Sequence, residues 1–240
     1  MRAEAAGGSG ASEAVSSASS KVAVAIMAKA PRPGAVKTRL CPPLLAAEAA
    51  ALYRCFLLDK IAAVGALADA QPVIAYTPDE ARAEFDGLAP GFSLVAQHGP
   101  DLGARLHATL AALLEAGHAG AIAVDSDTPT LPGDFLQQAV HYLSRPGPDV
   151  VLGPTEDGGY YLIGVRFPHR GLFDAVPWST SAVLDVTLRR AADAGLRAVC
   201  LSPWFDVDTP DDLERLRVAL DADATTAACE TRRLLASWRR

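Results

Sequence analysis

Two acidic doublets in this sequence have the spacing of a cation site. One is Asp125-Ser126-Asp127 and the other is Asp206-Val207-Asp208, and each follows an apolar run. In an extended chain, residues i and i+2 point the same way with Cα atoms about 6.5–7 Å apart, so a doublet can aim two carboxylates at one spot. Mg²⁺ is commonly held by one or two carboxylates together with the phosphate oxygens of a substrate. The doublets therefore indicate a metal-dependent enzyme that uses a nucleoside di- or triphosphate, although strand-end aspartates also serve as caps and turns.

The loop at residues 28–40, which follows the first apolar run, is rich in basic side chains: Lys29, Arg32, Lys37 and Arg39. It contains neither G-x-G-x-x-G nor G-x-x-x-x-G-K-[ST], so it is neither a dinucleotide-binding fingerprint nor a P-loop. Basic side chains in a loop near carboxylates can hold the phosphate groups of a nucleotide. A charged run can also be a solvated surface, but its place after the first strand favours the phosphate interpretation.

Two further segments are candidates for binding the acceptor of such a reaction. Residues 156–159, Glu-Asp-Gly-Gly, are a turn signal between two apolar runs, and their carboxylates could contact a metal or an acceptor hydroxyl. Residues 179–181, Ser-Thr-Ser, precede a helical pattern, and hydroxyls with free amides at a helix N-terminus form an anion site. A plain turn and plain helix capping are the structural alternatives. We expect the acceptor to lie beside Glu156, Asp157, Gly158, Gly159, Ser179, Thr180 and Ser181.

Strand-like apolar runs alternate with helix-like segments along most of the chain. Strands are expected at residues 21–27, 72–76, 92–96, 121–124, 149–152, 160–165 and 197–201. Helices are expected at 44–64, 101–114, 133–143 and 180–194, the last with Ser179 or Thr180 as N-cap, and another begins at Thr209-Pro210. This alternation predicts an α/β fold of three layers, α/β/α, with a mostly parallel central sheet. Ligands of such sheets lie beyond the carboxyl ends of the strands, where the basic loop and the first doublet both fall.

Composition limits the classes of protein to which this chain can belong. Its 240 residues, 50% of them apolar, suffice for one domain over residues 21–240. Residues 1–20 are rich in Ala, Ser and Gly and are expected to form a disordered tail. The net charge of −6 argues against nucleic-acid binding, and no apolar run is long enough for a membrane span. The four scattered cysteines predict free thiols in a cytoplasmic protein.

Taken together, the motifs resemble a known family. They are A-K-x-P-x-x-G-x-V-K-T-R-L, D-L-G-x-R-L, D-S-D-T-P-x-L-P, G-P-x-E-D-G-G-Y-Y-L-I-G, W-S-T and D-V-D-T-P-x-D-L, and they run from about Val22 to Leu216. This combination resembles the uncharacterised "transferase 1" family, whose members often accompany radical-SAM and selenium-related genes. The resemblance implies the GT-A fold of the nucleotide-diphosphosugar transferase superfamily.

A more distant resemblance is to the guanylyltransferases that activate 2-phospholactate or phosphoenolpyruvate. These enzymes share the K-T-R-L loop and the D-V-D-T-P segment, whereas the chain departs from them at residues 156–161, where it reads E-D-G-G-Y-Y. The resemblance implies that Lys37 and Arg39 contact a triphosphate. It also implies Mg²⁺ or Mn²⁺ as the cofactor, held by three ligands, Asp127, Asp206 and Asp208.

The sequence favours a nucleotidyltransferase that moves a nucleoside monophosphate from a nucleoside triphosphate to a small phosphorylated acceptor and releases pyrophosphate. The alternatives are a glycosyltransferase that uses a nucleotide sugar and a hydroxyl acceptor, and a non-catalytic nucleotide-binding protein. The basic loop favours nucleotidyl transfer because the pyrophosphate leaving group needs cations. We expect catalysis by Lys37, Asp127 and Asp157. The predicted nucleotide contacts are Lys29, Arg32, Lys37, Thr38, Arg39 and Asp125.

Overall fold

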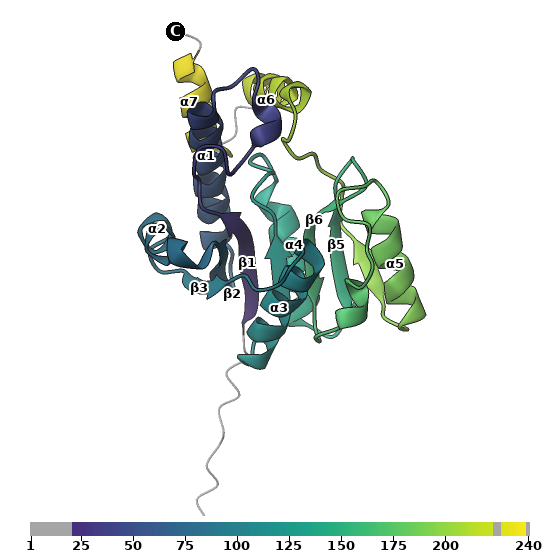
Figure 1. The fold of residues 1–240 in the computed structure, drawn as a ribbon. Helices are drawn as coiled ribbons and strands as arrows, with labels where there is room; N and C mark the ends of the chain where they lie inside the picture. Colours follow the sequence, from purple (N-terminus) through teal and green to yellow (C-terminus); the bar gives the residue numbers. More distant parts are fainter. Residues whose placement is uncertain (1–20, 223–226, 239–240) are drawn as a thin grey trace, which may run out of the picture.

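The structure, a computed structural model, describes residues 21–222 and 227–238. The tail expected at residues 1–20 lies outside the described residues. The described part of the chain forms a seven-stranded sheet in the order β3-β2-β1-β4-β6-β5-β7 (Figure 1). Strand β6 runs antiparallel to β4 and β5, and the other neighbours pair in parallel, so the predicted α/β fold with a mostly parallel sheet is confirmed. The strands are β1 (Val22–Lys29), β2 (Ala70–Thr77), β3 (Ser93–Ala96), β4 (Ala121–Val124), β5 (Val150–Pro154), β6 (Tyr160–Val165) and β7 (Ala198–Cys200).

Strand β1 is apolar at nearly every position because both faces of the sheet are covered. Its alternating side chains enter different cores: Val24 and Ile26 lie in one buried cluster, and Ala23 and Ala25 lie in the other. Successive side chains of a strand point to opposite faces, so a strand covered on both sides needs apolar residues throughout. The near-continuous run V-A-V-A-I-M-A therefore marks a central strand of the sheet.

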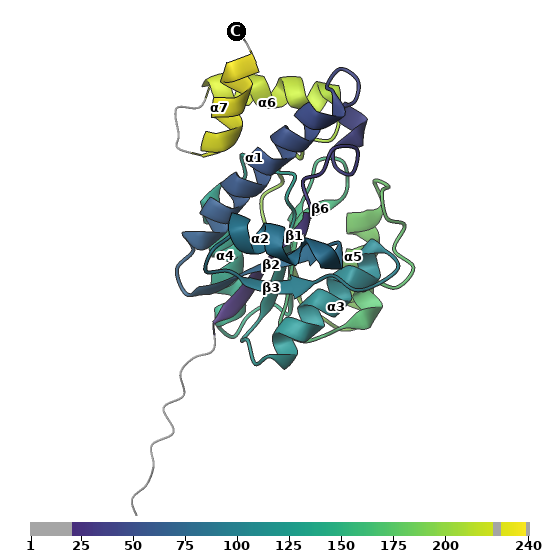
Figure 2. The same ribbon diagram turned by 60° about the vertical axis from the view of Figure 1, so that its left-hand side comes forward.

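Helices pack on both faces of the sheet and complete the three layers (Figures 1 and 2). Helices α1 (Ala46–Gly65), α2 (Arg82–Leu88) and α4 (Gly133–Ser144) contribute to the core on one face. Helices α3 (Leu102–Glu115) and α5 (Val183–Asp193) contribute to the core on the other. In the described part of the chain, three short 3₁₀ turns join the elements: η1 (Thr38–Leu40), η2 (Asp79–Ala81) and η3 (Arg170–Leu172).

A third core forms beyond the sheet, where the last two helices meet α1 (Figure 2). They are α6 (Pro210–Ala222) and α7 (Cys229–Trp238). Phe56 of α1, Leu216 of α6 and Leu235 of α7 are buried together there. The carboxylate of Asp59 in α1 accepts hydrogen bonds from the backbone amides of Glu230 and Thr231, both at 2.9 Å, and so caps the start of α7.

One predicted helix start is wrong. Helix α5 begins at Val183 with Ala182 as N-cap, rather than with Ser179 or Thr180. The Thr180 hydroxyl donates to the Pro177 carbonyl at 2.7 Å and accepts from the Ala182 amide at 3.3 Å. Short polar side chains often form such local bonds in place of helix structure. The segment before α5 is therefore a turn of its own, and its hydroxyls are not helix caps.

Two further findings concern the described residues as a whole. None of their helices combines the length and the apolar character needed to cross a membrane. Within the described residues, no disulfide joins Cys41, Cys55, Cys200 and Cys229.

Candidate active site

The basic loop and the first acidic doublet meet because their strands are neighbours. Strand β1 pairs in parallel with β4, with Ile26 opposite Val124, so the segments that follow both strands leave the same edge of the sheet. A cavity of about 520 Å³ lies at this edge. Eight of the predicted site residues line it: Lys29, Lys37, Thr38, Arg39, Asp125, Asp127, Ser179 and Asp208.

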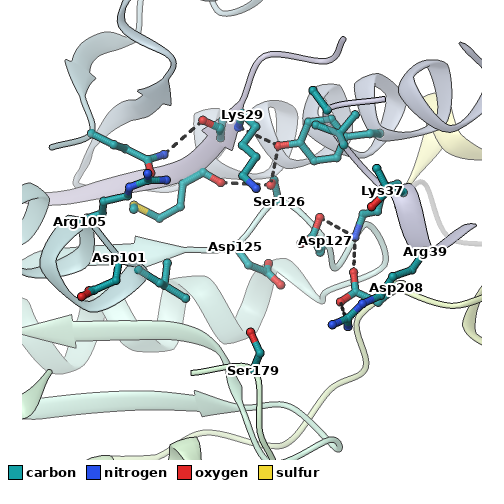
Figure 3. Close-up of a pocket in the computed structure, with 18 of the residues that line it drawn as sticks. Lys29, Lys37, Arg39, Asp101, Arg105, Asp125, Ser126, Asp127, Ser179 and Asp208 are labelled. Atoms are coloured by element: carbon teal, nitrogen blue, oxygen red, sulfur yellow. Dashed lines mark hydrogen bonds and ion pairs between the residues drawn. The ribbon is translucent and has the colours of Figure 1, made fainter. Parts of the chain in front are cut away.

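Lys37 is the centre of the charged end of this cavity (Figure 3). Its ammonium lies 2.7 Å from Asp127 Oδ1 and 2.8 Å from Asp208 Oδ1, and its side chain is only 4% exposed. Burial alone would lower the pKa of Lys37, but the charges of Asp127 and Asp208 outweigh burial and raise this pKa above its usual value. Lys37 is therefore a permanent cation held between the two acidic doublets.

A backbone hydrogen bond holds the second doublet beside the first one, next to Lys37. The Val207 amide donates to the Asp127 carbonyl at 3.0 Å, which joins the two D-x-D-T-P segments side by side. Thr209 and Asp212 cap helix α6 reciprocally: the Thr209 amide donates to Asp212 Oδ2 at 2.7 Å and the Asp212 amide donates to Thr209 Oγ1 at 3.3 Å. Because these two residues cap the helix, the carboxylate of Asp208 remains available to Lys37.

Asp206 lies apart from that contact. It does not line the cavity. Burial and the charges of Asp157 and Asp208 raise the pKa of Asp206 to about 7. Within the described ranges, no group of three or more His, Cys, Asp or Glu side chains is placed to hold a metal ion by itself. Of the three predicted metal ligands, the structure thus brings Asp127 and Asp208 together around one cation.

This donor set fits a metal that arrives with phosphate. Mg²⁺ keeps most of its ligands as water or substrate oxygens and takes one or two carboxylates from the protein. Asp127 and Asp208 already share one cation, the Lys37 ammonium, so their carboxylates are close enough to bind a single positive centre. A closed cage of protein ligands is not needed for Mg²⁺ in such a site.

Asp125 pairs with a buried lysine that was not among the predicted site residues. Lys60 of α1 is 2% exposed, and its ammonium lies 2.6 Å from Thr128 Oγ1 and 3.3 Å from Asp125 Oδ1. The Thr128 hydroxyl donates to the same Asp125 oxygen at 2.6 Å. Burial raises the pKa of Asp125 and lowers the pKa of Lys60, while each charge offsets the cost of burying the other. The pair fixes the start of the first doublet.

Ser126, the middle residue of the first doublet, anchors it to two other elements. Its hydroxyl donates to the Met27 carbonyl at 3.1 Å and shares a hydrogen bond of 2.9 Å with the Tyr53 hydroxyl. Tyr53 in turn accepts from the Lys29 amide at 3.0 Å. Burial raises the pKa of Tyr53 to about 12, so this phenol stays protonated and serves as a structural donor.

The far end of the cavity is built by residues that were not predicted as site residues (Figure 3). Gln97 follows β3, and its amide nitrogen donates to the Ala28 and Ala75 carbonyls at 3.2 and 2.7 Å. Arg105 donates to the Gly99 carbonyl at 3.0 Å. The D-L-G-x-R-L motif, which begins with the α3 cap Asp101, was the sequence signal for this end of the site.

The other basic residues of the loop differ in their surroundings. Lys29 and Arg39 line the cavity, and Arg39 lies 3.8 Å from Asp208 Oδ2 with 69% of its side chain exposed. Arg32 does not line the cavity, because its guanidinium pairs with Glu84 at 2.7 Å and Glu80 at 3.5 Å. The structure therefore places Lys29 and Arg39, but not Arg32, on the wall of the cavity.

The two predicted acceptor segments lie against each other. A Cβ on Gly158 would stand 2.2 Å from the Ser181 carbonyl oxygen, and the Leu184 amide donates to the Gly158 carbonyl at 2.9 Å. Gly158 has φ of +91°, a conformation that disfavours any residue with a side chain. Ser179 lines the cavity and so connects these two segments to it.

The two carboxylates of the 156–159 turn are used within the protein. Glu156 accepts a bidentate pair of hydrogen bonds from Arg215 at 2.5 and 2.8 Å, and this ties the turn to α6. Asp157 Oδ1 accepts from the Thr155 hydroxyl at 2.5 Å and from the Gly159 amide at 3.0 Å. These hydrogen bonds hold the 156–159 turn in place. Those described for Asp157 involve only one of its two carboxylate oxygens.

Gly103 of the D-L-G-x-R-L motif brings α3 into contact with Trp178, which precedes the predicted acceptor segment at residues 179–181. A Cβ at this position would stand 2.8 Å from the Trp178 ring and 3.0 Å from the Phe173 carbonyl oxygen. Trp178 also packs edge-on against Tyr160, with ring centroids 6.3 Å apart. The glycine therefore allows Trp178 to lie flush against α3, next to the cavity residue Ser179.

Comparisons with known proteins agree with this architecture. The family model described as "Uncharacterized protein conserved in bacteria (DUF2064)" matches residues 60–180. A solved structure from Desulfovibrio desulfuricans G20, described as a "putative nucleotide-diphospho-sugar transferase", is 32% identical, with a TM-score of 0.82. The match covers 91% of this chain and 95% of that chain. No protein of curated function matches the sequence at a significant level.

Two more distant structures share the fold. One is CMP:2-keto-3-deoxy-manno-octonic acid synthetase complexed with CTP, at 12% identity and a TM-score of 0.56, covering 85% of this chain and 99% of that chain. The other is 4-diphosphocytidyl-2C-methyl-D-erythritol synthase, at 14% identity and a TM-score of 0.54, covering 84% and 98%. The fold predicted from the GT-A resemblance is thereby confirmed.

Proposed function

This chain belongs to the DUF2064 family, and we propose that it is a metal-dependent nucleotidyltransferase. It joins a nucleoside monophosphate from a nucleoside triphosphate to a small phosphorylated acceptor and releases pyrophosphate. The observation that carries the proposal is the position of Lys37, whose ammonium lies between Asp127 and Asp208 at the edge of a cavity of about 520 Å³. Cations and carboxylates in one place are what a metal-bound triphosphate requires.

The residues of the site divide the work of such a reaction. Asp127 and Asp208 would hold Mg²⁺ or Mn²⁺, which when bound neutralises charge on the phosphates. Lys37 and Arg39 would bind the pyrophosphate part and stabilise the charge that develops on it as the bond to the α-phosphate breaks. The nucleoside would extend toward Gln97 and Arg105 at the far end of the cavity.

The acceptor would approach from the side of Ser179, which lines the cavity next to the 156–159 turn. Its phosphate oxygen attacks the α-phosphorus of the nucleotide, the bond from that phosphorus to the bridging oxygen breaks, and pyrophosphate leaves with the electron pair. A phosphate nucleophile is already deprotonated at neutral pH, so the reaction needs no general base. Positioning and charge neutralisation then account for the catalysis.

Glycosyl transfer is the second candidate, favoured by two observations. The relative at 32% identity is described as a nucleotide-diphospho-sugar transferase. Asp157 belongs to the predicted acceptor segment at residues 156–159, and its described hydrogen bonds involve only Oδ1. In that reaction Asp157 would accept the proton of a hydroxyl acceptor.

A product assay separates the two reactions. Purified protein is incubated with each of the four ribonucleoside triphosphates, or with a panel of nucleotide sugars, in Mg²⁺ or Mn²⁺ and with mixtures of phosphorylated and hydroxylated small acceptors. Nucleotidyl transfer predicts pyrophosphate release that depends on a triphosphate, a metal and a phosphorylated acceptor. Release of a nucleoside diphosphate from a nucleotide sugar would overturn it in favour of glycosyl transfer. The Asp127→Asn variant is the control for contaminating activity in either arm.

A further inference from the structure

Lys37 occupies the position where the proposed site would need its metal. Its ammonium contacts one oxygen of Asp127 and one of Asp208, at 2.7 and 2.8 Å. These are the two carboxylates that lie together at the cavity, and Lys37 is nearly fully buried between them. A divalent cation and an ammonium cannot both bridge the same pair of carboxylates, because the two positive charges would repel each other at contact distance.

The loop that carries Lys37 is anchored, so this placement is not that of a free surface side chain. Val36, the preceding residue, is buried against Ala50 and Tyr53 of α1. Lys37 itself has φ of +49°, in the left-handed region that a lysine rarely adopts. Its ammonium also lies 5.9 Å from the centre of the Phe56 ring. The backbone therefore fixes where the side chain starts, while its four rotatable bonds leave the ammonium able to move within the cavity.

The charges of the site indicate what would displace the Lys37 ammonium from the carboxylates. Lys37 and Arg39 together offset the charges of Asp127 and Asp208, so a metal that enters alone leaves the site with an excess of positive charge. A complex of Mg²⁺ with a nucleoside triphosphate is anionic, and it brings phosphate oxygens that can replace the carboxylates as partners of the two basic side chains. Combined entry of metal and nucleotide therefore gives the displaced basic side chains new anionic partners, which metal alone does not supply.

We propose that Lys37 is an internal counter-ion that blocks the Asp127–Asp208 metal site until a metal–nucleotide complex displaces it onto the phosphates. The inference rests on the proposed function, because it assumes that these carboxylates receive a metal. It assigns Lys37 two successive sets of partners, carboxylates first and phosphates afterwards. It also sets the order of binding, since metal alone binds weakly and metal with nucleotide binds tightly.

The test measures Mn²⁺ binding in the absence of nucleotide, by electron paramagnetic resonance and by calorimetry, so that no turnover is required. Lys37→Met should bind Mn²⁺ on the order of tenfold more tightly than the wild type, because the competing charge is gone. Lys29→Met is the matched control: it removes the same charge from the wall of the same cavity, and Lys29 makes no ion pair with a carboxylate in the described part of the chain. Its Mn²⁺ affinity should stay within about twofold of the wild type.

Lys37→Gln provides a second variant if the methionine variant does not fold, since its amide can still donate to a carboxylate. Circular dichroism verifies the fold of each variant. Equal or weaker Mn²⁺ binding by folded Lys37 variants overturns the inference while leaving the proposed function intact, provided that the wild type binds Mn²⁺ together with a nucleoside triphosphate. If neither the wild type with each of the four ribonucleoside triphosphates nor the Lys37 variants bind Mn²⁺, the metal site itself is wrong, and both proposals fail.

Discussion

The Val207 amide donates a hydrogen bond of 3.0 Å to the Asp127 carbonyl and thereby lays the second acidic doublet alongside the first. Side by side, the doublets place Asp127 and Asp208 around the Lys37 ammonium. The repeated D-x-D-T-P pattern thus has two parts. The Thr-Pro half turns the chain into the next element, and an aspartate of each doublet faces the shared cation.

Asp127→Asn should lower the rate of nucleotidyl transfer on the order of 10²-fold or more, because it removes a charge that the transition state needs. The melting temperature should change by only a few degrees, since the Asp127 side chain is 36% exposed and Lys37 keeps its contact with Asp208. Steady-state kinetics at saturating Mg²⁺ and a thermal scan measure both effects. Asp206→Asn should cost less, because Asp206 does not line the cavity. Wild-type activity in the Asp127 variant would remove this residue from the metal site.

Lys60→Met should lower the free energy of unfolding by about 3 kcal/mol, because it leaves the half-buried Asp125 carboxylate without its cationic partner. Adding Asp125→Asn to this variant should recover part of the loss, since a neutral amide tolerates the same place. Urea unfolding of the two single variants and the double variant gives the coupling between them. A double variant that is less stable than Lys60→Met alone would show that the two side chains do not act as a pair.

Gly158→Ala and Gly117→Ala form a matched pair for the contact between the acceptor segments. The two glycines have φ of +91° and +92°, but a Cβ at Gly158 would stand 2.2 Å from the Ser181 carbonyl oxygen, whereas Gly117 has open space. Both substitutions should cost about 1–2 kcal/mol for the left-handed backbone. The Gly158 variant should lose a further 1–3 kcal/mol or so because of crowding. Equal losses in chemical denaturation would mean that the two segments separate easily.

The pH dependence of stability should carry the signature of Asp206. Its pKa in the folded protein is about 7, above the value of about 3.9 for an exposed aspartate. A raised carboxyl pKa means that the folded state holds a proton that the unfolded state has lost, so stability should fall as pH rises from about 4 to about 7. Asp206→Asn should flatten this decline in a series of melting curves. An unchanged slope in the variant would show that another group causes it.

The sequence predicted the fold and the meeting of the main motifs because the necessary signals are local. Apolar runs marked the strands, and the rule that ligands lie beyond the carboxyl ends of strands brought the K-T-R-L loop to the first doublet. Lys37 and Asp208 are 171 positions apart in the sequence, and no local sequence pattern around either residue predicts their contact. The motifs therefore predicted that the basic loop and the acidic doublets meet, but not that a lysine would lie between the carboxylates.

The unpredicted features depend on contacts between distant parts of the chain. Lys60 lies in a helical pattern, where a lysine is usually exposed to solvent. It is buried because α1 packs against residues 125–128. Asp59 caps the start of helix α7, and it is about as far from α7 in sequence as Lys37 is from Asp208, so no local pattern predicts this contact. The ion pair of Glu156 with Arg215 likewise joins the 156–159 turn to α6 across a long sequence separation, and no local pattern predicts it.

In the proposed reaction, Asp127 and Asp208 receive a metal together with a nucleotide while Lys37 moves to the phosphates. A crystal grown with Mn²⁺ and a non-hydrolysable nucleoside triphosphate, with anomalous scattering recorded for manganese, tests it most directly. We expect a manganese peak in contact with both carboxylates and the Lys37 ammonium bonded to phosphate oxygens. A nucleotide bound in the cavity with Lys37 still between the carboxylates, or with manganese away from both of them, would contradict it.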